Sequence, residues 1–156
     1  MLVEMYQRWL FEVWGKGDEA VAAEVLAEDL VDHNRVPEQP MGRAGDLWAA
    51  RSVRNAFPDL QFTLDVCFEH DDLVTGRWTM RGTHTGTLEL LGIPATGRPV
   101  EMSGQEIFRA RDGRFVEVWH VEDIGAMQRG LDLVPPPAML KMAARRSARK
   151  YKRSQR

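Results

Sequence analysis

The sequence predicts an α+β fold in which N-terminal helices pack in a strongly curved, mainly antiparallel β-sheet. Apolar side chains recur at helical spacing up to residue 57, and from residue 60 onward they alternate as strand residues do. A run of helices followed by a run of strands is typical of α+β proteins. The chain of 156 residues is long enough for one core of ordinary size.

Three helices are expected before residue 58. The first is indicated by apolar side chains spaced three and four apart, namely Tyr6, Leu10, Val13 and Trp14. Asp18 can cap the second helix, and the third ends before Pro58. Between the second and third helices the chain is expected to become extended before Pro37. His33 and Asn34 are therefore expected where a helix passes into a loop.

Two β-hairpins follow, the first with its turn at residues 70–72 and the second with its turn at Asp112 and Gly113. The register of the second hairpin decides which side chains face inward. A type I turn with a bulged Gly113 would place Glu106, His120 and Glu122 on one face. A two-residue primed turn would oppose Glu106 to Trp119 instead, and the alternative acids Glu117 and Asp123 would then face inward.

Charge separates a C-terminal tail from the rest of the chain. Residues 1–132 carry 23 acidic and 13 basic side chains, whereas residues 133–156 carry eight basic and no acidic ones. We therefore expect a domain over residues 1–133 and a basic tail over 134–156 that is partly helical or disordered. Such a tail can contact an anionic partner, although a solvated arm is the plainer interpretation, and without interleaved aromatic residues nucleic acid is not expected.

Several functional classes are excluded by what the sequence lacks. The single cysteine, Cys67, rules out an intrachain disulfide. No run of about 18 apolar residues is present to cross a membrane, and the first residues do not read as an export signal, so a cytoplasmic protein is expected. The sequence contains no dinucleotide-binding, P-loop, zinc-protease or serine-hydrolase motif, and its four histidines lack metal-ligand spacing.

A set of short motifs, in a fixed order, resembles a known family. The motifs over residues 1 to about 133 are EVWGKGD, AEDLVDHN, AFPDLQF, RWTMRGTHTG, GIPATGRPV, IFRARDGRFVEVWHVED and MQRGL. Together they are similar to the SnoaL-like polyketide cyclases (ester cyclases), within the superfamily that shares the nuclear transport factor 2 (NTF2-like, or cystatin-like) cone. The resemblance implies a homodimer packed through the sheet, with no metal and no organic cofactor.

The resemblance also implies a reaction, an enolate-forming intramolecular aldol cyclisation of an aromatic polyketide. Cyclases of this family use an aspartate on the last strand as acid/base, supported by a histidine on the preceding strand. Those two positions fall on His120 and Glu106, so the residue types are exchanged. Since an imidazole titrates near neutrality, we expect His120 to be the acid/base and Glu106 its partner. Alternatives are a cofactor-independent hydroxylase (monooxygenase) on a similar substrate and a non-catalytic protein that binds a hydrophobic ligand.

Substrate contacts are expected from six further residues. His33 and Asn34, a polar pair at the cavity mouth, and His84 at the rim would orient the ligand. The apolar side chains expected to line the cavity are Trp78, Phe108 and Val118. Asp32 is adjacent to His33, but neighbouring side chains on an extended segment diverge. No role is expected for His70.

Overall fold

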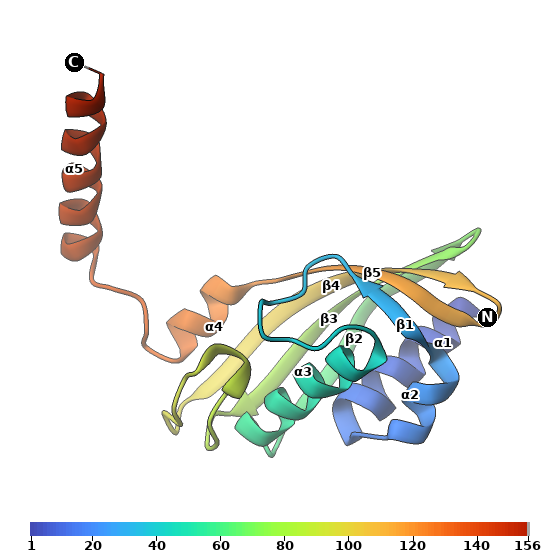
Figure 1. Ribbon diagram of the computed structural model, residues 1–156. Coiled ribbons are helices and arrows are strands. Elements are labelled where there is room, and N and C mark those ends of the chain that lie inside the picture. The colour runs from blue at the N-terminus through green and yellow to red at the C-terminus, as the bar shows by residue number, and fades with distance from the viewer. Residues whose placement is uncertain (156) are drawn as a thin grey trace.

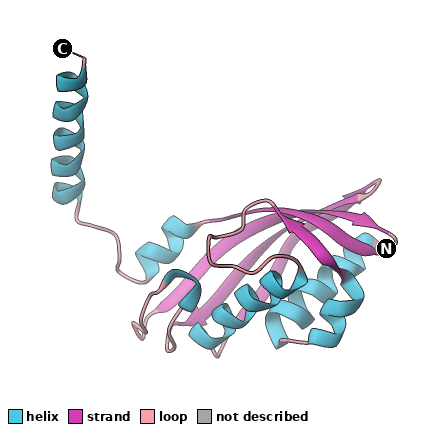
Figure 2. Cartoon of the chain, viewed as in Figure 1, coloured by secondary structure: helices cyan, strands magenta, loops and turns pink. Residues whose placement is uncertain are grey.

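The computed structural model describes residues 1–155, which form a curved sheet with helices against one face and a last helix that stands apart (Figure 1). The secondary-structure colouring of Figure 2 shows the same layers. The helices are α1 (Leu2–Arg8), the π-helical η1 (Trp9–Trp14), α2 (Glu19–Val25), α3 (Arg43–Ala56), the short 3-10 helix η2 (Glu89–Leu91), α4 (Ile124–Gly130) and α5 (Pro137–Ser154).

The sheet has five strands in the order β1-β5-β4-β3-β2. The strands are β1 (Leu26–Asp32), β2 (Gln61–His70), β3 (Leu73–Thr83), β4 (Pro99–Arg111) and β5 (Arg114–Glu122). β1 pairs in parallel with β5, and the other pairs are antiparallel. The predicted α+β class and mainly antiparallel sheet are therefore confirmed. The strand β1 corrects one expectation, because His33 and Asn34 follow a strand and not a helix.

The predicted apolar stripe forms the core side of the first helical segment. Tyr6, Leu10 and Val13 are 1% exposed or less, and they pack beneath the sheet. Asp18 caps α2 as expected, with its carboxylate accepting from the backbone N–H groups of Ala20 and Val21, each at 3.0 Å. The helical layer thus closes one face of the sheet.

The second hairpin combines the two geometries that the sequence left open. Asp112 and Gly113 both have positive φ, 50° and 75°, as a two-residue primed turn requires. Farther from the turn, however, the register shifts between Arg109 and Ala110 because β5 holds one extra residue. This bulge restores the pairing of Glu106 with His120, so both side chains point to the helical face.

The basic tail forms the 18-residue helix α5, longer than the short helix expected. Its side chains are exposed, and Figure 1 shows it directed away from the sheet. Within residues 1–155, no helix has the length and apolar character that a membrane span would need. The division of the chain at residue 133 stays a prediction.

Candidate functional site

A cavity of about 300 Å³ lies between the sheet and the helices. Most of its wall is apolar and includes Leu10, Val53, Met80 and Met127. Polar side chains also line it, namely Asp32, Asn34, Gln39, Asp46, Glu106, His120 and Glu122. A mostly apolar hollow with a few converging polar groups is the usual form of a small-molecule site.

Two glycines let aromatic side chains lie directly on the sheet beside the cavity. A Cβ atom on Gly76 would come within 2.4 Å of the Tyr6 ring, and one on Gly104 within 2.3 Å of the Trp78 ring. Glycine has no side chain, so it leaves room for these rings where any other residue would not. Tyr6 on α1 and Trp78 on β3 can therefore both reach the Glu106 side chain.

Glu106 is held by these two aromatic residues and is 4% exposed. The Tyr6 hydroxyl lies 2.6 Å from Glu106 Oε2, and the Trp78 indole N–H donates to Oε1 at 2.8 Å and Oε2 at 2.7 Å. Burial raises the pKa of Glu106 to about 8, although both hydrogen bonds act to lower it. The carboxyl group is therefore mainly protonated at neutral pH. A protonated Glu106 can donate to the Tyr6 oxygen while Tyr6 donates to the Gly76 carbonyl, 3.1 Å away.

His120 lies between two carboxylates. Its Nδ1 is 2.7 Å from Glu122 Oε1 and its Nε2 is 3.1 Å from Asp32 Oδ1. Since an ionised carboxylate only accepts, both ring nitrogens carry hydrogen and the ring is an imidazolium. Burial lowers the pKa of His120, but the hydrogen bonds and charges of Asp32 and Glu122 outweigh it and raise the pKa to about 10. The cation is therefore stable at neutral pH.

Asp32 is fixed by several donors besides His120. Its oxygens accept from the backbone N–H of Asn34 at 2.8 Å and from the Gln39 amide at 2.9 Å. Burial raises the pKa of Asp32, yet the hydrogen bonds with His120, Asn34 and Gln39 and the charge of His120 leave it below its usual value. Glu122 is different, because among residues 1–155 the hydrogen bonding of its carboxylate is confined to His120. The Glu122 carboxylate therefore has fewer hydrogen-bond donors than the Asp32 carboxylate.

Five of the predicted site residues line the cavity, namely Glu106, His120, Asn34, Trp78 and Val118. Glu106 and His120 are register neighbours, but the predicted direct pair is replaced by separate partners. The Asn34 side chain accepts from the His120 backbone N–H at 3.0 Å and so supports the imidazole. The role of His120 as the acid/base stays a prediction, and the two carboxylates beside the ring favour its protonated form.

Three predicted residues lie elsewhere. His33 points to the outer face of the sheet, where it bonds Glu117 at 3.0 Å and stacks on Trp119 with ring centroids 4.5 Å apart. The structure therefore does not bring His33 to the cavity, because alternation along the extended chain sends Asp32 inward and His33 outward.

His84 and Phe108 are buried outside the cavity wall. The His84 Nδ1 bonds Thr96 and so ties the ends of the rim loop together. Phe108 is 0% exposed and stacks on Phe115 at 4.3 Å, which makes it part of the core. Neither residue contacts the cavity. The alternative acid Glu117 also lies on the outer face, as its bond to His33 shows.

The alternative acid Asp123 caps α4 through the backbone N–H of Ala126. Sequence reasoning missed Glu122 as a functional group, although it placed this residue on the inward face with His120. It also gave Asp32 no cavity role. The missing signal was the parallel pairing of β1 with β5, which brings Asp32 to His120.

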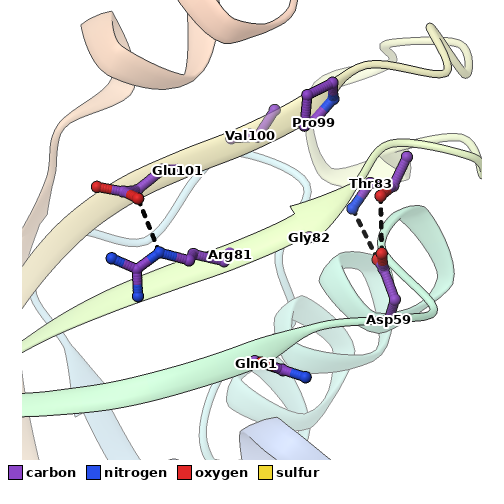
Figure 3. A pocket seen from close by; sticks show the side chains of 8 residues that line it. All are labelled: Asp59, Gln61, Arg81, Gly82, Thr83, Pro99, Val100 and Glu101. Atoms are coloured by element: carbon purple, nitrogen blue, oxygen red, sulfur yellow. Dashed lines mark hydrogen bonds and ion pairs between the residues drawn. The ribbon is translucent and has the colours of Figure 1, made fainter.

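A second depression of about 540 Å³ lies at the ends of β2, β3 and β4 (Figure 3). Its ionic groups pair with each other: Arg81 bonds Glu101 at 2.7 Å, and Asp59 accepts from the N–H and hydroxyl of Thr83. Most of its side chains are exposed. In the described residues, no group of three or more His, Cys, Asp or Glu side chains could hold a metal ion. The enclosed cavity is therefore the candidate site.

Comparison with known proteins gives a family match over most of the chain. The family model described as SnoaL-like polyketide cyclase matches residues 4–131. A search of curated proteins found no match. Among solved structures, IdmH of Streptomyces antibioticus, a proposed polyketide cyclase, is 33% identical with a TM-score of 0.67 over 83% of this chain and 96% of its own.

Two further structures extend the comparison. TsrD of Streptomyces laurentii is 27% identical with a TM-score of 0.76, and the alignment covers 85% of this chain and 96% of TsrD. AclR of Streptomyces galilaeus, a proposed hydroxylase, is 24% identical with a TM-score of 0.69 and covers 100% of this chain and 99% of AclR. The likeness to AclR concerns the fold alone.

Proposed function

The chain belongs to the SnoaL-like polyketide cyclase family, and we propose that it closes a ring in an aromatic polyketide by an enolate-forming intramolecular aldol reaction. The observation that carries this proposal is the array Asp32–His120–Glu122 in a mostly apolar cavity. It offers one available carboxylate and one fixed cation. Enolate chemistry needs these two groups, a base and a stabiliser of negative charge.

Glu122 is the base in this proposal. It removes a proton from a carbon that is flanked by carbonyl groups, and the resulting enolate carbon attacks a ketone carbon of the same molecule. A carbon–carbon bond forms, and the ketone π electrons move to its oxygen. That oxygen then takes the proton back from Glu122. The reaction is an isomerisation and consumes no other reactant.

His120 has a supporting role as an imidazolium. It is held 2.7 Å from Glu122, so its charge is next to the site where the enolate forms. Glu106 contributes by being mainly neutral, since one more charged carboxylate beside those already in the wall would add to the repulsion of the enolate. This assignment keeps the carboxylate–histidine pair that the family resemblance implies, with Glu122 in place of Glu106 as the partner.

The test is turnover of an aromatic polyketide methyl ester by wild-type protein, followed by mass spectrometry. A product of unchanged mass supports cyclisation, whereas a gain of one oxygen atom with oxygen uptake would identify a hydroxylase acting through the same carbanion. Glu122→Gln and His120→Phe should each abolish turnover, and Glu101→Gln, an exposed carboxylate on β4, is the matched control. A wild-type protein that binds the ester without converting it would refute the enzymatic proposal.

We also propose a homodimer packed through the outer face of the sheet. Apolar side chains are exposed on its strands, with Val121 67% and Ile107 38% exposed in the single chain. Exposed apolar patches of this kind commonly mark an interface. Light scattering should give twice the monomer mass, and Val121→Asp should reduce it to one monomer. A monomeric wild type would contradict the proposal.

A further inference from the structure

Asp46 is a carboxylate of the cavity wall that the proposed reaction does not use. It lies in the first turn of α3, on the same helical face as Ala49 and Val53, and all three residues line the cavity. The Trp9 indole N–H donates to Asp46 Oδ1 at 3.3 Å and Oδ2 at 3.2 Å, and the Trp14 indole donates to Oδ1 at 3.1 Å. Both indoles also line the cavity.

The hydrogen-bonding capacity of Asp46 is only partly used. Two carboxylate oxygens offer about four acceptor positions, whereas Oδ2 receives only one branch of the shared Trp9 bond. The ion pairs found within residues 1–155 do not include Asp46. Burial raises the pKa of Asp46 to about 6 despite both indole bonds, so the group is mainly ionised at pH 7.5.

Asp46 lines the cavity, where water can solvate it while no ligand is bound. The wall beside it is apolar, with Ala49, Val53 and Leu90 among its residues. A ligand that fills the cavity therefore removes water from a carboxylate that has no cationic partner among the described residues. Leaving such an acceptor unsatisfied is costly, and a hydrogen-bond donor on the ligand avoids that cost.

Positioning the two indoles does not by itself require a carboxylate. A neutral amide oxygen accepts from an indole N–H equally well and costs less to bury. The charge is better explained by a partner that arrives with the ligand. An aromatic hydroxyl fits, because it is a neutral donor that forms a charge-assisted hydrogen bond to a carboxylate.

We propose that Asp46 is a specificity-determining residue that accepts a hydrogen bond from a phenolic hydroxyl of the substrate. The inference rests on the proposed function, because it assumes that an aromatic carbonyl compound occupies the cavity. It adds that this compound carries a free hydroxyl group at the end that faces Asp46. A methyl ether at that place would present oxygen lone pairs and a methyl group to the carboxylate.

The test uses the full chain and three aromatic ketones of similar size: fluorenone, 2-hydroxyfluorenone and 2-methoxyfluorenone. Their affinities are measured at pH 7.5 by isothermal titration calorimetry. We expect the hydroxyl compound to bind about tenfold to a hundredfold more tightly than the methoxy compound. Asp46→Asn should reduce that ratio to near one, while Asp65→Asn, a carboxylate bonded to Arg77 and Thr79, should leave it unchanged.

A second variant separates ligand recognition from a structural role. Trp14→Phe removes one donor to Asp46 and leaves the carboxylate in place, so the preference for the hydroxyl compound should be kept. Loss of the preference in Trp14→Phe, or its full retention in Asp46→Asn, would overturn the inference. If fluorenone binds but wild-type protein shows no preference, the inference alone fails. If none of the three ketones binds, the proposed function fails with it.

Discussion

Replacing Glu106 with glutamine should stabilise the protein at alkaline pH. The raised pKa of about 8 means that the folded protein keeps a proton on Glu106 over a pH range in which the unfolded chain has lost it. Glutamine is a permanently neutral side chain of the same shape. Its amide oxygen can accept from Trp78, and its amide nitrogen can donate to the Tyr6 hydroxyl, which then donates to the Gly76 carbonyl.

The magnitude follows from the two pKa values. Below pH 4.5 both states hold the proton and Glu106 has no effect on the pH dependence of stability. Between 4.5 and about 8 the folded state holds more protons, so the free energy of unfolding falls as pH rises, and above 8 the loss levels off. The pKa difference corresponds to a total of about 5 kcal/mol. We therefore expect Glu106→Gln to gain up to about 5 kcal/mol over wild type at pH 9 and little at pH 4.5.

Urea denaturation of wild type and Glu106→Gln between pH 4.5 and 9 measures this difference. The raised pKa of His120 contributes stability that is fully present below 6.5 and is lost as pH rises through about 10. That contribution is common to both proteins and cancels in the comparison. Glu101→Gln, on the solvent side of β4, should follow wild type. A Glu106→Gln protein that is less stable than wild type at every pH, with the same pH slope, would refute a protonated Glu106.

Three further results are expected. Gly104→Ala should destabilise the fold by about 1–3 kcal/mol in urea denaturation, because its Cβ would meet the Trp78 ring at 2.3 Å, whereas Gly15→Ala, whose Cβ would make an ordinary contact with the Leu10 carbonyl oxygen at 3.6 Å, should not. Asp18→Ala should cost about 1 kcal/mol through loss of the α2 cap, and an unchanged midpoint would contradict that role. Deleting residues 137–156 should leave polyketide turnover essentially unchanged, since α5 is exposed; a large loss would show that the helix acts on the cavity.

The fold was predictable because its elements have local signals. The stripe through Tyr6 and Leu10 and the Asp112–Gly113 turn each act over a few residues, and the structure contains both. The bulge in β5 was harder to predict from the sequence. It lies beside Phe115, which is fully buried, and burial at one position of a strand is decided by the packing of the whole sheet.

Several residues that line the cavity were predictable from the sequence, but their hydrogen-bond partners were not. Alternation along β4 and β5 put Glu106, His120 and Glu122 on one face. The partner of His120 could not be found in the same way, because Asp32 is 88 positions away and comes from a strand that pairs in parallel. A parallel contact leaves no turn in the sequence to fix its register. The protonation states follow from burial, which the sequence does not give.

The charges of the cavity wall explain why one imidazolium is enough for the proposed reaction. His120 is already balanced by Asp32 and Glu122 before substrate enters. When Glu122 takes the proton from carbon, its own negative charge disappears as the enolate charge appears a short distance away. The total charge around His120 therefore stays constant, and the wall needs no reorganisation during the step. A ligand that carries its own carboxylate would instead add a negative charge next to Asp32, Asp46 and Glu122. The same array that favours forming an enolate inside the cavity thus opposes the entry of an anion from outside.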